Sequence, residues 1–515
     1  MHHDDIDARR RRLLLASAGL FALGNSACAT RPVVLAPTAD PFTLGIASGD
    51  PEPDGFVIWT RLAPQPLQGG GMPQSAVEVS WEVAHDEGFQ RIVSAGTAVA
   101  EPAWAHSVHV EVQGLAPDRW YWYRFRWGDA RSPVGRSRTA PAAGATLASL
   151  RFAYASCQHY EQGYYSAYRH LVADHPDLVL HLGDYIYESS SAGGVRQHEA
   201  GEPHSLADYR NRHACYKLDA DLRAAHAACP WLLCWDDHEV DNDYAGTHGQ
   251  DEESEDRFLL RRAAAYQAYW EHMPLRRYLR PTGPSLLLYQ RSSFGDLVGF
   301  HVLDTRQYRS DQACGTAEKR GGQVVTQCEA LRDPAQTMLG PTQENWFLHG
   351  LGITETRWNF IAQSMLMAPL DQAPGPEYGS WTDGWDGYPA ARERILRQLA
   401  GSRTPNPVVI GGDIHSFWAT ELSLAADAPP VATEFTGSSI SSNGVPYERF
   451  AAMLPENPHV KFFDSRKRGY VMCELVRERL DVAFRVVDDV RDAASGASTL
   501  ARFVVENGQA RVLPG

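Results

Sequence analysis

The sequence predicts an α/β domain that is preceded by an all-β domain of the fibronectin or immunoglobulin type. Between residues 42 and 139, short stretches of β-branched and aromatic residues, such as Phe56–Thr60 and Val77–Val83, alternate with turn residues, as in a β-sandwich. After residue 150, apolar runs of strand length alternate with polar loops and helical stretches, as in an α/β sheet. We therefore expect a β-sandwich domain over residues 40–140 and an α/β domain over residues 148–515.

The charge of the chain argues against one class of partner. Formal net charge is -15, from 63 acidic and 48 basic residues. The electrostatic field of such a surface repels a nucleic-acid backbone, so we expect no specific nucleic-acid binding. An excess of carboxylates also occurs in metal-binding proteins, but the totals alone are better explained by solubility.

The cysteines argue against a structural zinc module. Eight cysteines are scattered along the chain without a CxxC pair, which makes a structural zinc site a poor interpretation. Cys314 and Cys328 lie in a polar, glycine-containing stretch and are the better disulfide candidates. A Cys215–Cys229 pair stays open.

The N-terminal residues predict export. Arg9–Arg12 precede the apolar run Leu13–Leu23, which is too short to span a bilayer and is typical of a signal peptide. Paired arginines before such a run resemble the twin-arginine signal, which the twin-arginine export machinery recognises. We expect a signal peptide over residues 1–30, a periplasmic or extracellular location and no transmembrane segment in the mature form. Cleavage after Ala29 is preferred, and lipidation of Cys28 is the alternative.

The ends of the predicted strands carry metal-binding residue types. In α/β sheets, ligands collect at the carboxyl ends of the strands. Taken singly, each of these residues has an ordinary structural explanation, such as a capping aspartate or a buried cysteine. Together they would leave several charges in one crevice, which is too costly unless cations neutralise them. The residues after the four strands are Cys157, Asp184 and Tyr187, Asp237 and Asn242, and Asp413 and His415.

The donor types suggest which cations are bound. Thiolate, phenolate and imidazole suit a redox-capable transition metal such as iron, whereas carboxylate and amide oxygens suit calcium or magnesium. Asp184 is placed to bind both cations. Two cations ~3.5–4 Å apart would clamp a phosphate and lower the pKa of a bound water.

Four motifs then resemble those of the alkaline phosphatase D (PhoD-like) family, within the calcineurin-like metallophosphoesterase superfamily. The resemblance spans nearly the whole chain after the predicted signal peptide, and it implies a four-layer metallophosphoesterase-type β-sandwich flanked by helices. It also implies hydrolysis of phosphomonoesters and phosphodiesters by metal-activated hydroxide, with ferric iron (Fe³⁺), calcium (Ca²⁺) and twin-arginine export. The motifs are Ala-Ser156-Cys157-Gln158, Leu-Gly-Asp184-Tyr-Ile-Tyr187, Trp-Asp-Asp237-His-Glu and Gly-Gly-Asp413-Ile-His415.

The resemblance also implies roles for single residues. His238 would lie near the substrate phosphate. By position, iron would be held by Cys157, Asp184, Tyr187 and His415, and calcium by Asp184, Asp237, Asn242 and Asp413.

Two further sets of residues are weaker candidates. Arg306 follows another apolar strand and is a candidate for contacting the phosphate, although an arginine there more often ties down a loop by an ion pair. Trp381, Trp385 and Tyr388 are candidates for the wall of the substrate entrance, with ordinary aromatic packing as the alternative.

Two rival functions stay open. A phospholipase D-type phosphodiesterase, acting on phospholipids or phosphodiester polymers, would share the metal core, because only the pocket walls distinguish its substrates. An inactive phosphatase-like protein that binds a surface through its β-sandwich would have lost metal ligands. The complete set of ligand positions in this chain argues against that loss.

Overall fold

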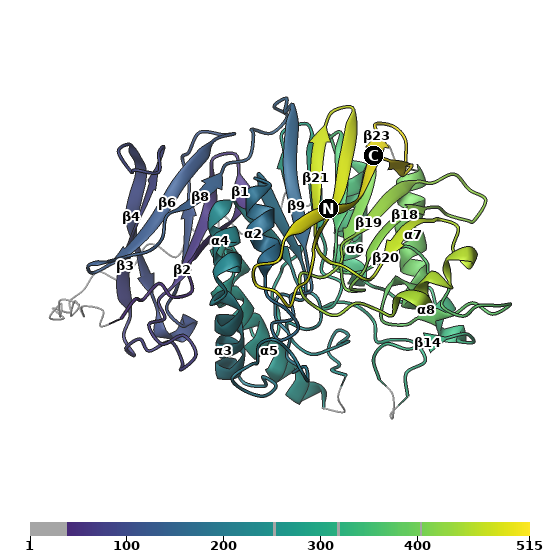
Figure 1. The fold of residues 1–515 in the computed structure, drawn as a ribbon, viewed down its shortest axis with the longest axis horizontal. Helices are drawn as coiled ribbons and strands as arrows, with labels where there is room; N and C mark the ends of the chain where they lie inside the picture. Colours follow the sequence, from purple (N-terminus) through teal and green to yellow (C-terminus); the bar gives the residue numbers. More distant parts are fainter. Residues whose placement is uncertain (1–38, 251–253, 317–319, 402–403) are drawn as a thin grey trace, which may run out of the picture. The chain divides into compact units, whose positions relative to one another are not determined.

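Two large β-sheets lie face to face in the computed structural model (Figure 1), which describes residues 39–250, 254–316, 320–401 and 404–515. The rings of Phe152 in β9 and of Phe300 and Phe360 in the opposite sheet meet at 5.2 and 5.0 Å between centroids, so the core lies between the sheets. The first sheet has the order β24 (Leu513–Pro514), β23 (Ala497–Glu506), β22 (Arg479–Val487), β21 (Arg468–Val476), β9 (Ser149–Ala155), β10 (Leu178–Leu182), β11 (Trp231–Cys234), β1 (Ile46–Glu52), β2 (Gly55–Arg61) and β5 (Ser107–Val112).

The second sheet supplies the other half of the core. Its central strands β13, β15, β17 and β19 run parallel and are buried along their whole length, as expected for strands that are covered on both faces. Its order is β12 (Gln290–Phe294), β13 (Val298–Val302), β15 (Trp358–Ala362), β17 (Pro407–Gly411), β19 (Ala432–Thr436), β18 (Phe417–Leu422) and β20 (Val460–Asp464).

Helices cover the outer faces of both sheets and complete the four layers. Tyr168 of α2 and Leu222 of α4 belong to the core of the first sheet, and Phe347 of α6 and Ile395 of α7 pack against the second. The predicted fold class is thereby confirmed. The helices are α2 (Ser166–Ala173), α3 (Leu206–Lys217), α4 (Ala220–Ala228), α5 (Glu255–His272), α6 (Gly340–Gly352), α7 (Pro389–Gly401) and α8 (Tyr447–Ala451).

The N-terminal strands form the all-β part of the fold, but one of their sheets continues into the large sheet. β1 pairs in parallel with β11, at Gly49 and Trp231. A Cβ at Gly49 would lie 2.5 Å from the backbone oxygen of Pro274, so this close approach requires glycine. The boundaries at 40–140 and 148–515 stay a prediction. The remaining strands are β4 (Ile92–Ala100), β3 (Val77–Ala84), β6 (Trp120–Trp127), β7 (Ala130–Arg131) and β8 (Gly135–Arg138), with β14 (Val324–Val325) and β16 (Ser380–Trp381) as a separate pair.

Two further expectations can be compared with the structure. Cys314 and Cys328 form a disulfide with a sulfur–sulfur distance of 2.01 Å, whereas Cys215 and Cys229 are free thiols. None of the helices in the described ranges is long and apolar enough to cross a membrane. The predicted signal peptide and Cys28 lie outside the described residues.

Helix α3 places a lysine in the core beside the first sheet. Lys217 is 1% exposed, and its Nζ lies 4.6 Å from the ring centroid of Trp59 and 5.4 Å from that of Tyr185. Burial lowers the pKa of this amine to about 7, because the charged form loses its hydration.

We predict that Lys217→Met stabilises the protein in a pH-dependent way. Below pH 7 the lysine is charged in both the folded and the unfolded state, so the cost of burying the charge is fully present. The substitution should then raise the free energy of unfolding by on the order of 3 kcal/mol. Between pH 7 and 10 this difference in the free energy of unfolding should shrink, because the lysine of the folded protein loses its proton at a lower pH than the lysine of the unfolded chain. Urea unfolding of both proteins at pH 6 and 9.5 tests this, and an equal gain at both values would contradict it.

Candidate metal centre

The candidate ligands follow the carboxyl ends of strands from both sheets. Strands β9, β10 and β11 are parallel neighbours, so the loops after them meet at one edge of the first sheet. These loops carry Cys157, Asp184 and Asp237, while the loop after β17 in the second sheet carries Asp413 and His415. The fold therefore presents residues from two facing sheets to one place.

Four of these residues have a backbone conformation that is unfavourable for L-amino acids. The φ angles are 58° at Cys157, 56° at Asp184, 63° at Asp413 and 51° at His415, all in the left-handed region. Each such residue costs about 1–2 kcal/mol, and conformations of this kind cluster at functional sites. Gly183 precedes Asp184 with φ +100°, and a Cβ there would lie 2.6 Å from Cβ of Asp236, so the β10 loop requires glycine at this point.

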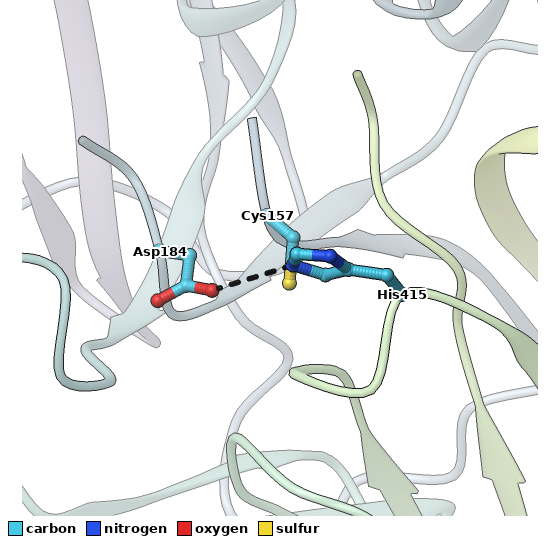
Figure 2. A group of neighbouring side chains, drawn as sticks. All are labelled: Cys157, Asp184 and His415. Atoms are coloured by element: carbon cyan, nitrogen blue, oxygen red, sulfur yellow. Dashed lines mark ion pairs between the residues drawn. The ribbon is translucent and has the colours of Figure 1, made fainter. Parts of the chain in front are cut away.

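Cys157, Asp184 and His415 form the first group of candidate ligands (Figure 2). Their ligand atoms lie within 4.8 Å of one another. Nε2 of His415 is 3.9 Å from Oδ2 of Asp184. Nδ1 of His415 lies 2.7 Å from the backbone oxygen of Asn443, so Nδ1 carries the proton and Nε2 has a free lone pair that points at the group.

Tyr187 joins this group through its hydroxyl. The phenol donates to Oδ2 of Asp184 at 2.8 Å, lies 2.9 Å from Nε2 of His415 and accepts from Ser442 at 2.9 Å. All four predicted iron ligands are thus brought together.

The pKa values of the first group favour its neutral form in the absence of a cation. Burial raises the pKa of the Cys157 thiol and of the Tyr187 phenol well above their ordinary values, and the Asp184 carboxylate adds to both shifts. Burial lowers the pKa of His415 to about 3. The imidazole is therefore in the form that binds metals, whereas thiolate and phenolate would need a cation to offset their charge.

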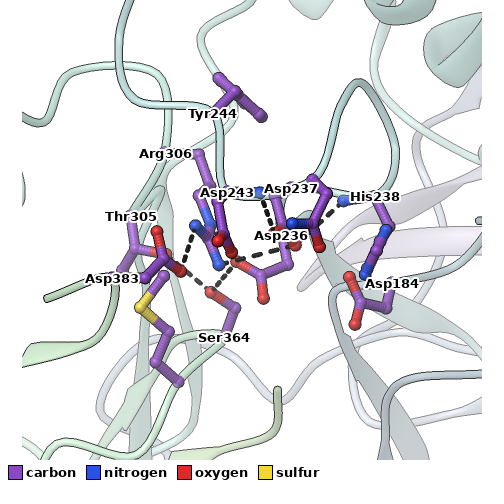
Figure 3. Close-up of polar contacts among 12 residues, drawn as sticks. Asp184, Asp236, Asp237, His238, Asp243, Tyr244, Thr305, Arg306, Ser364 and Asp383 are labelled. Atoms are coloured by element: carbon purple, nitrogen blue, oxygen red, sulfur yellow. Dashed lines mark hydrogen bonds and ion pairs between the residues drawn. The ribbon is translucent and has the colours of Figure 1, made fainter. Parts of the chain in front are cut away.

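Two more groups adjoin the first (Figure 3). Asp184, Asp237 and His238 bring ligand atoms within 4.8 Å of one another, and so do Asp237, Asp243 and Asp383. Asp184 is shared by the first and second groups, and Asp237 by the second and third. The three groups therefore form one continuous acidic centre.

His238 is held in this centre by a carboxylate. Its Nδ1 lies 2.7 Å from Oε2 of Glu188, and its side chain is 16% exposed. Burial alone would lower the pKa of His238, but the carboxylates of Glu188 and Asp237 outweigh it and hold that pKa well above its ordinary value. The ring therefore has a fixed orientation and carries a proton.

Asn242 and Asp413 lie beside the groups. Nδ2 of Asn242 donates to Gln250 at 2.9 Å, and its backbone N–H donates to Glu188 at 3.3 Å. Burial raises the pKa of Asp413 well above its ordinary value, and the charge of Asp236 adds to the shift. The contacts of Asn242 and the influence of Asp236 on the pKa of Asp413 place both residues in the region of the centre without fixing them as ligands.

Arg306 lies among the carboxylates instead of facing the surface. It is fully buried, and its guanidinium contacts Asp236 at 2.5 Å, Asp383 at 2.8 Å and Asp237 at 3.5 Å. Arg309 adds a contact to Asp383 at 2.5 Å. This geometry favours the ion-pair alternative over phosphate contact for Arg306.

The centre still contains acceptor atoms that are not satisfied. Oδ1 of Asp184 and Oδ2 of Asp236 are buried and lack a hydrogen-bond partner in the described part of the chain. A buried carboxylate oxygen without a partner is costly. The carboxylates of the three groups also outnumber the two guanidinium groups that contact them. Both observations fit a site for cations.

Comparison with known proteins identifies the family. The model of the PhoD-like phosphatase family matches residues 152–484, and the model of its N-terminal domain matches residues 27–141. The chain belongs to the PhoD-like phosphatase family. It is 47% identical over 483 residues to alkaline phosphatase D of Bacillus subtilis (strain 168), a match that covers 91% of this chain and 81% of the relative. A solved structure described as that of PhoD has a TM-score of 0.88 at 45% identity and covers 93% of this chain and 94% of its own.

Family membership confirms the enzyme class that the sequence predicts. This PhoD-like phosphatase is a phosphoric ester hydrolase. Its described residues include groups that are able to hold metal ions, at the strand ends where the sequence analysis expected them.

The sequence analysis did not find three residues of the centre. Asp243 and Asp383 complete the third group, and Glu188 holds His238. Asp243 and Glu188 each follow a predicted ligand by one residue, which was the available signal. Asp383 follows the two-residue strand β16 (Ser380–Trp381), which is too short to recognise from its pattern.

We predict that Arg306→Met destabilises the metal-free protein strongly. Removing the guanidinium leaves Asp236 buried without a cationic partner and Asp383 with Arg309 as its remaining cation, which should cost about 3–5 kcal/mol. Arg397→Met is the control, because Arg397 is 69% exposed and pairs with Glu393 on the surface, and should cost less than about 0.5 kcal/mol. Urea unfolding measures both. Equal stability of the two variants, with a raised KM for Arg306→Met alone, would instead assign Arg306 to the substrate.

Proposed function

We propose that this chain is an exported, metal-dependent phosphatase that hydrolyses phosphomonoesters and phosphodiesters. The observation that carries the proposal is the sharing of Asp184 and Asp237 between adjoining groups of ligand atoms. Shared carboxylates of this kind suit neighbouring cations, because one carboxylate bridges two ions. The unsatisfied Oδ1 of Asp184 supports the same assignment.

The donor atoms suggest how the cations are distributed. We assign ferric iron to the thiol, phenol and imidazole side, and calcium to the oxygen-rich side. When bound, these ions would offset the charge that develops on the phosphate and lower the pKa of an attacking water. Iron would be held by Cys157, Asp184, Tyr187 and His415, and calcium would be held by Asp184, Asp237, Asn242 and Asp413.

The protein itself supplies orientation and a proton. Nδ1 of His238 is occupied by Glu188, so Nε2 is the nitrogen that faces the substrate. A proton on Nε2 is available to the ester oxygen as the alcohol leaves, and to a phosphate oxygen before that step. Arg306 holds Asp236, Asp237 and Asp383 in place by ion pairs, which makes it a positioning residue in this proposal.

The proposed location rests on the N-terminal residues. Paired arginines before a short apolar run support recognition by the twin-arginine export machinery and a periplasmic or extracellular enzyme. That machinery carries folded proteins, which suits a metal centre buried between two sheets.

Hydrolysis assays test the function. We expect release of p-nitrophenol from mono- and bis-p-nitrophenyl phosphate at alkaline pH, with loss of activity on chelation and recovery on addition of calcium. Asp237→Asn should lower kcat/KM by about 100-fold or more, since it removes a carboxylate ligand of the proposed calcium site. Asp427→Asn, an exposed aspartate, is the control and should retain activity.

The assay also separates the rivals. A strong preference for the diester would favour a phosphodiesterase of the phospholipase D type. No hydrolysis of either ester after full metal loading would overturn the enzymatic proposal and favour a surface-binding protein.

Absorption spectroscopy tests the iron assignment. We expect a visible charge-transfer band in the iron-loaded protein, which Tyr187→Phe shifts or abolishes because it removes the phenolate ligand. Tyr185→Phe is the matched control, because the Tyr185 hydroxyl contacts His226 at 2.7 Å and lies outside the group. A colourless protein with stoichiometric zinc would contradict the assignment.

A further inference from the structure

A cavity of about 320 Å³ opens beside the metal centre and shares two residues with it. Asp413 and His415 line both. The other walls come from three segments: the loop that follows β15, the stretch from β16 to Asp386, and the chain around α8. A phosphate bound at the centre would therefore have this space next to it.

The walls of the cavity are largely apolar and fixed by packing. Leu366, Leu370, Ile414, Val445 and Phe450 line it, and all five pack in one hydrophobic cluster with Trp418 and Phe463. The rings of Trp418 and Phe463 lie 4.4 Å apart between centroids. The cavity is thus preformed, as binding sites for small molecules usually are.

Of the three aromatic residues predicted at the substrate entrance, two line the cavity and one is engaged elsewhere. Trp381 and Trp385 line this cavity, and Nε1 of Trp385 donates to Gln363 at 3.0 Å, which fixes the indole. Tyr388 is not among the lining residues, and its hydroxyl donates to the backbone oxygen of Ser310 at 2.6 Å.

The carboxylate in the wall is already engaged. Asp386 forms an ion pair with Arg392 at 2.6 Å and accepts from the backbone N–H of Leu370 at 2.8 Å. The cavity therefore offers mainly apolar contact and no free anion on this side, although Gln372 and Arg449 also line it. Its volume lies within the range of about 300–1,000 Å³ that small-molecule sites occupy.

We propose that this cavity binds the alcohol portion of the substrate, and that the enzyme prefers phosphate esters of apolar alkyl or aryl alcohols over esters of polar alcohols such as glycerol. This inference rests on the proposed function, because the phosphate must bind at the metal centre. Apolar groups gain free energy on leaving water for such a cavity, whereas hydroxyl groups there would lose hydrogen bonds to water.

A nearby polar cavity is less suited to this role. It measures about 270 Å³, is lined by Arg466, Lys467 and Arg468, and does not include Asp413 or His415. Three of its basic groups are already engaged, since Arg466 pairs with Asp464, Lys467 donates to the backbone of Asp488, and Arg468 donates to the backbone of His415.

Gly384 offers a way to fill the apolar cavity without straining the backbone. It lines the cavity and has φ -85°, which any residue adopts. A Cβ there would meet Cδ1 of Trp381 at 3.5 Å, an ordinary contact. Gly384→Leu should therefore occupy the space that the alcohol would take.

A homologous series of substrates tests the inference. The n-alkyl phosphates from methyl to hexyl have leaving alcohols of similar basicity, so they differ mainly in apolar length. We expect kcat/KM of the metal-loaded enzyme to rise by up to about four-fold per methylene over the first few carbons. The inhibition constants of n-alkylphosphonates should fall in parallel, and glycerol 2-phosphate should be a poorer substrate than butyl phosphate.

Variants test whether the dependence of kcat/KM on chain length arises in this cavity. Gly384→Leu should abolish the dependence on chain length, and Leu366→Gln should weaken that dependence. Leu424→Gln, at a surface leucine that is 41% exposed, is the control and should behave like the wild type.

Several outcomes would overturn the inference. These are a flat response to chain length in the wild type, or an unchanged slope in both Gly384→Leu and Leu366→Gln. Absence of hydrolysis of every ester, methyl phosphate included, would be a failure of the proposed function instead. Calorimetric titration of the metal-loaded protein with methyl- and hexylphosphonate would then still decide the inference, since equal affinities would refute it.

Discussion

The structure depends on the cost of burying several carboxylates at one point. Asp184, Asp236, Asp237 and Asp383 are each at most 2% exposed, and an ionised carboxylate without a partner is strongly disfavoured in such surroundings. Arg306 and Arg309 offset part of the charge through short contacts. The remaining charge and the unsatisfied oxygen of Asp184 mean that further positive charge at this point would stabilise the arrangement.

Two facing sheets are what make this concentration of ligands possible. Neighbouring strands of one sheet lie about 4.8 Å apart, so the loops of β9, β10 and β11 by themselves would present a row of side chains. The loop after β17 comes from the opposite sheet, about 10 Å away in a typical packing. It places His415 opposite this row, so that the ligand atoms surround one point. The left-handed conformations at Cys157, Asp184, Asp413 and His415 turn these loops sharply enough for their side chains to meet.

Local patterns in the sequence were sufficient to predict an α/β domain after an all-β domain and most of the residues that converge, whereas the four layers followed from the resemblance to the PhoD-like family. Cys157, Asp184 and His415 follow apolar strands directly, so the general rule about strand ends applied to them. The rule could not find Asp383, because the strand before it, β16, has only two residues and gives no recognisable pattern. It also could not decide the role of Arg306, since full burial among three carboxylates is a property of the tertiary structure. The pairing of β1 with β11 through Gly49 and Trp231 is equally non-local.

The apolar cavity and the acidic centre support each other physically. The side chain of His415 is 23% exposed, and this residue faces a cavity whose walls bind water poorly. An alcohol that fills the cavity would remove water from around the ester bond, and electrostatic interactions strengthen when water is excluded. A substrate with an apolar alcohol would therefore bind more tightly for two reasons. Its alcohol is buried in the cavity, and its phosphate interacts more strongly with the charges of the centre. A polar alcohol would bring its hydration into the cavity and lose both advantages.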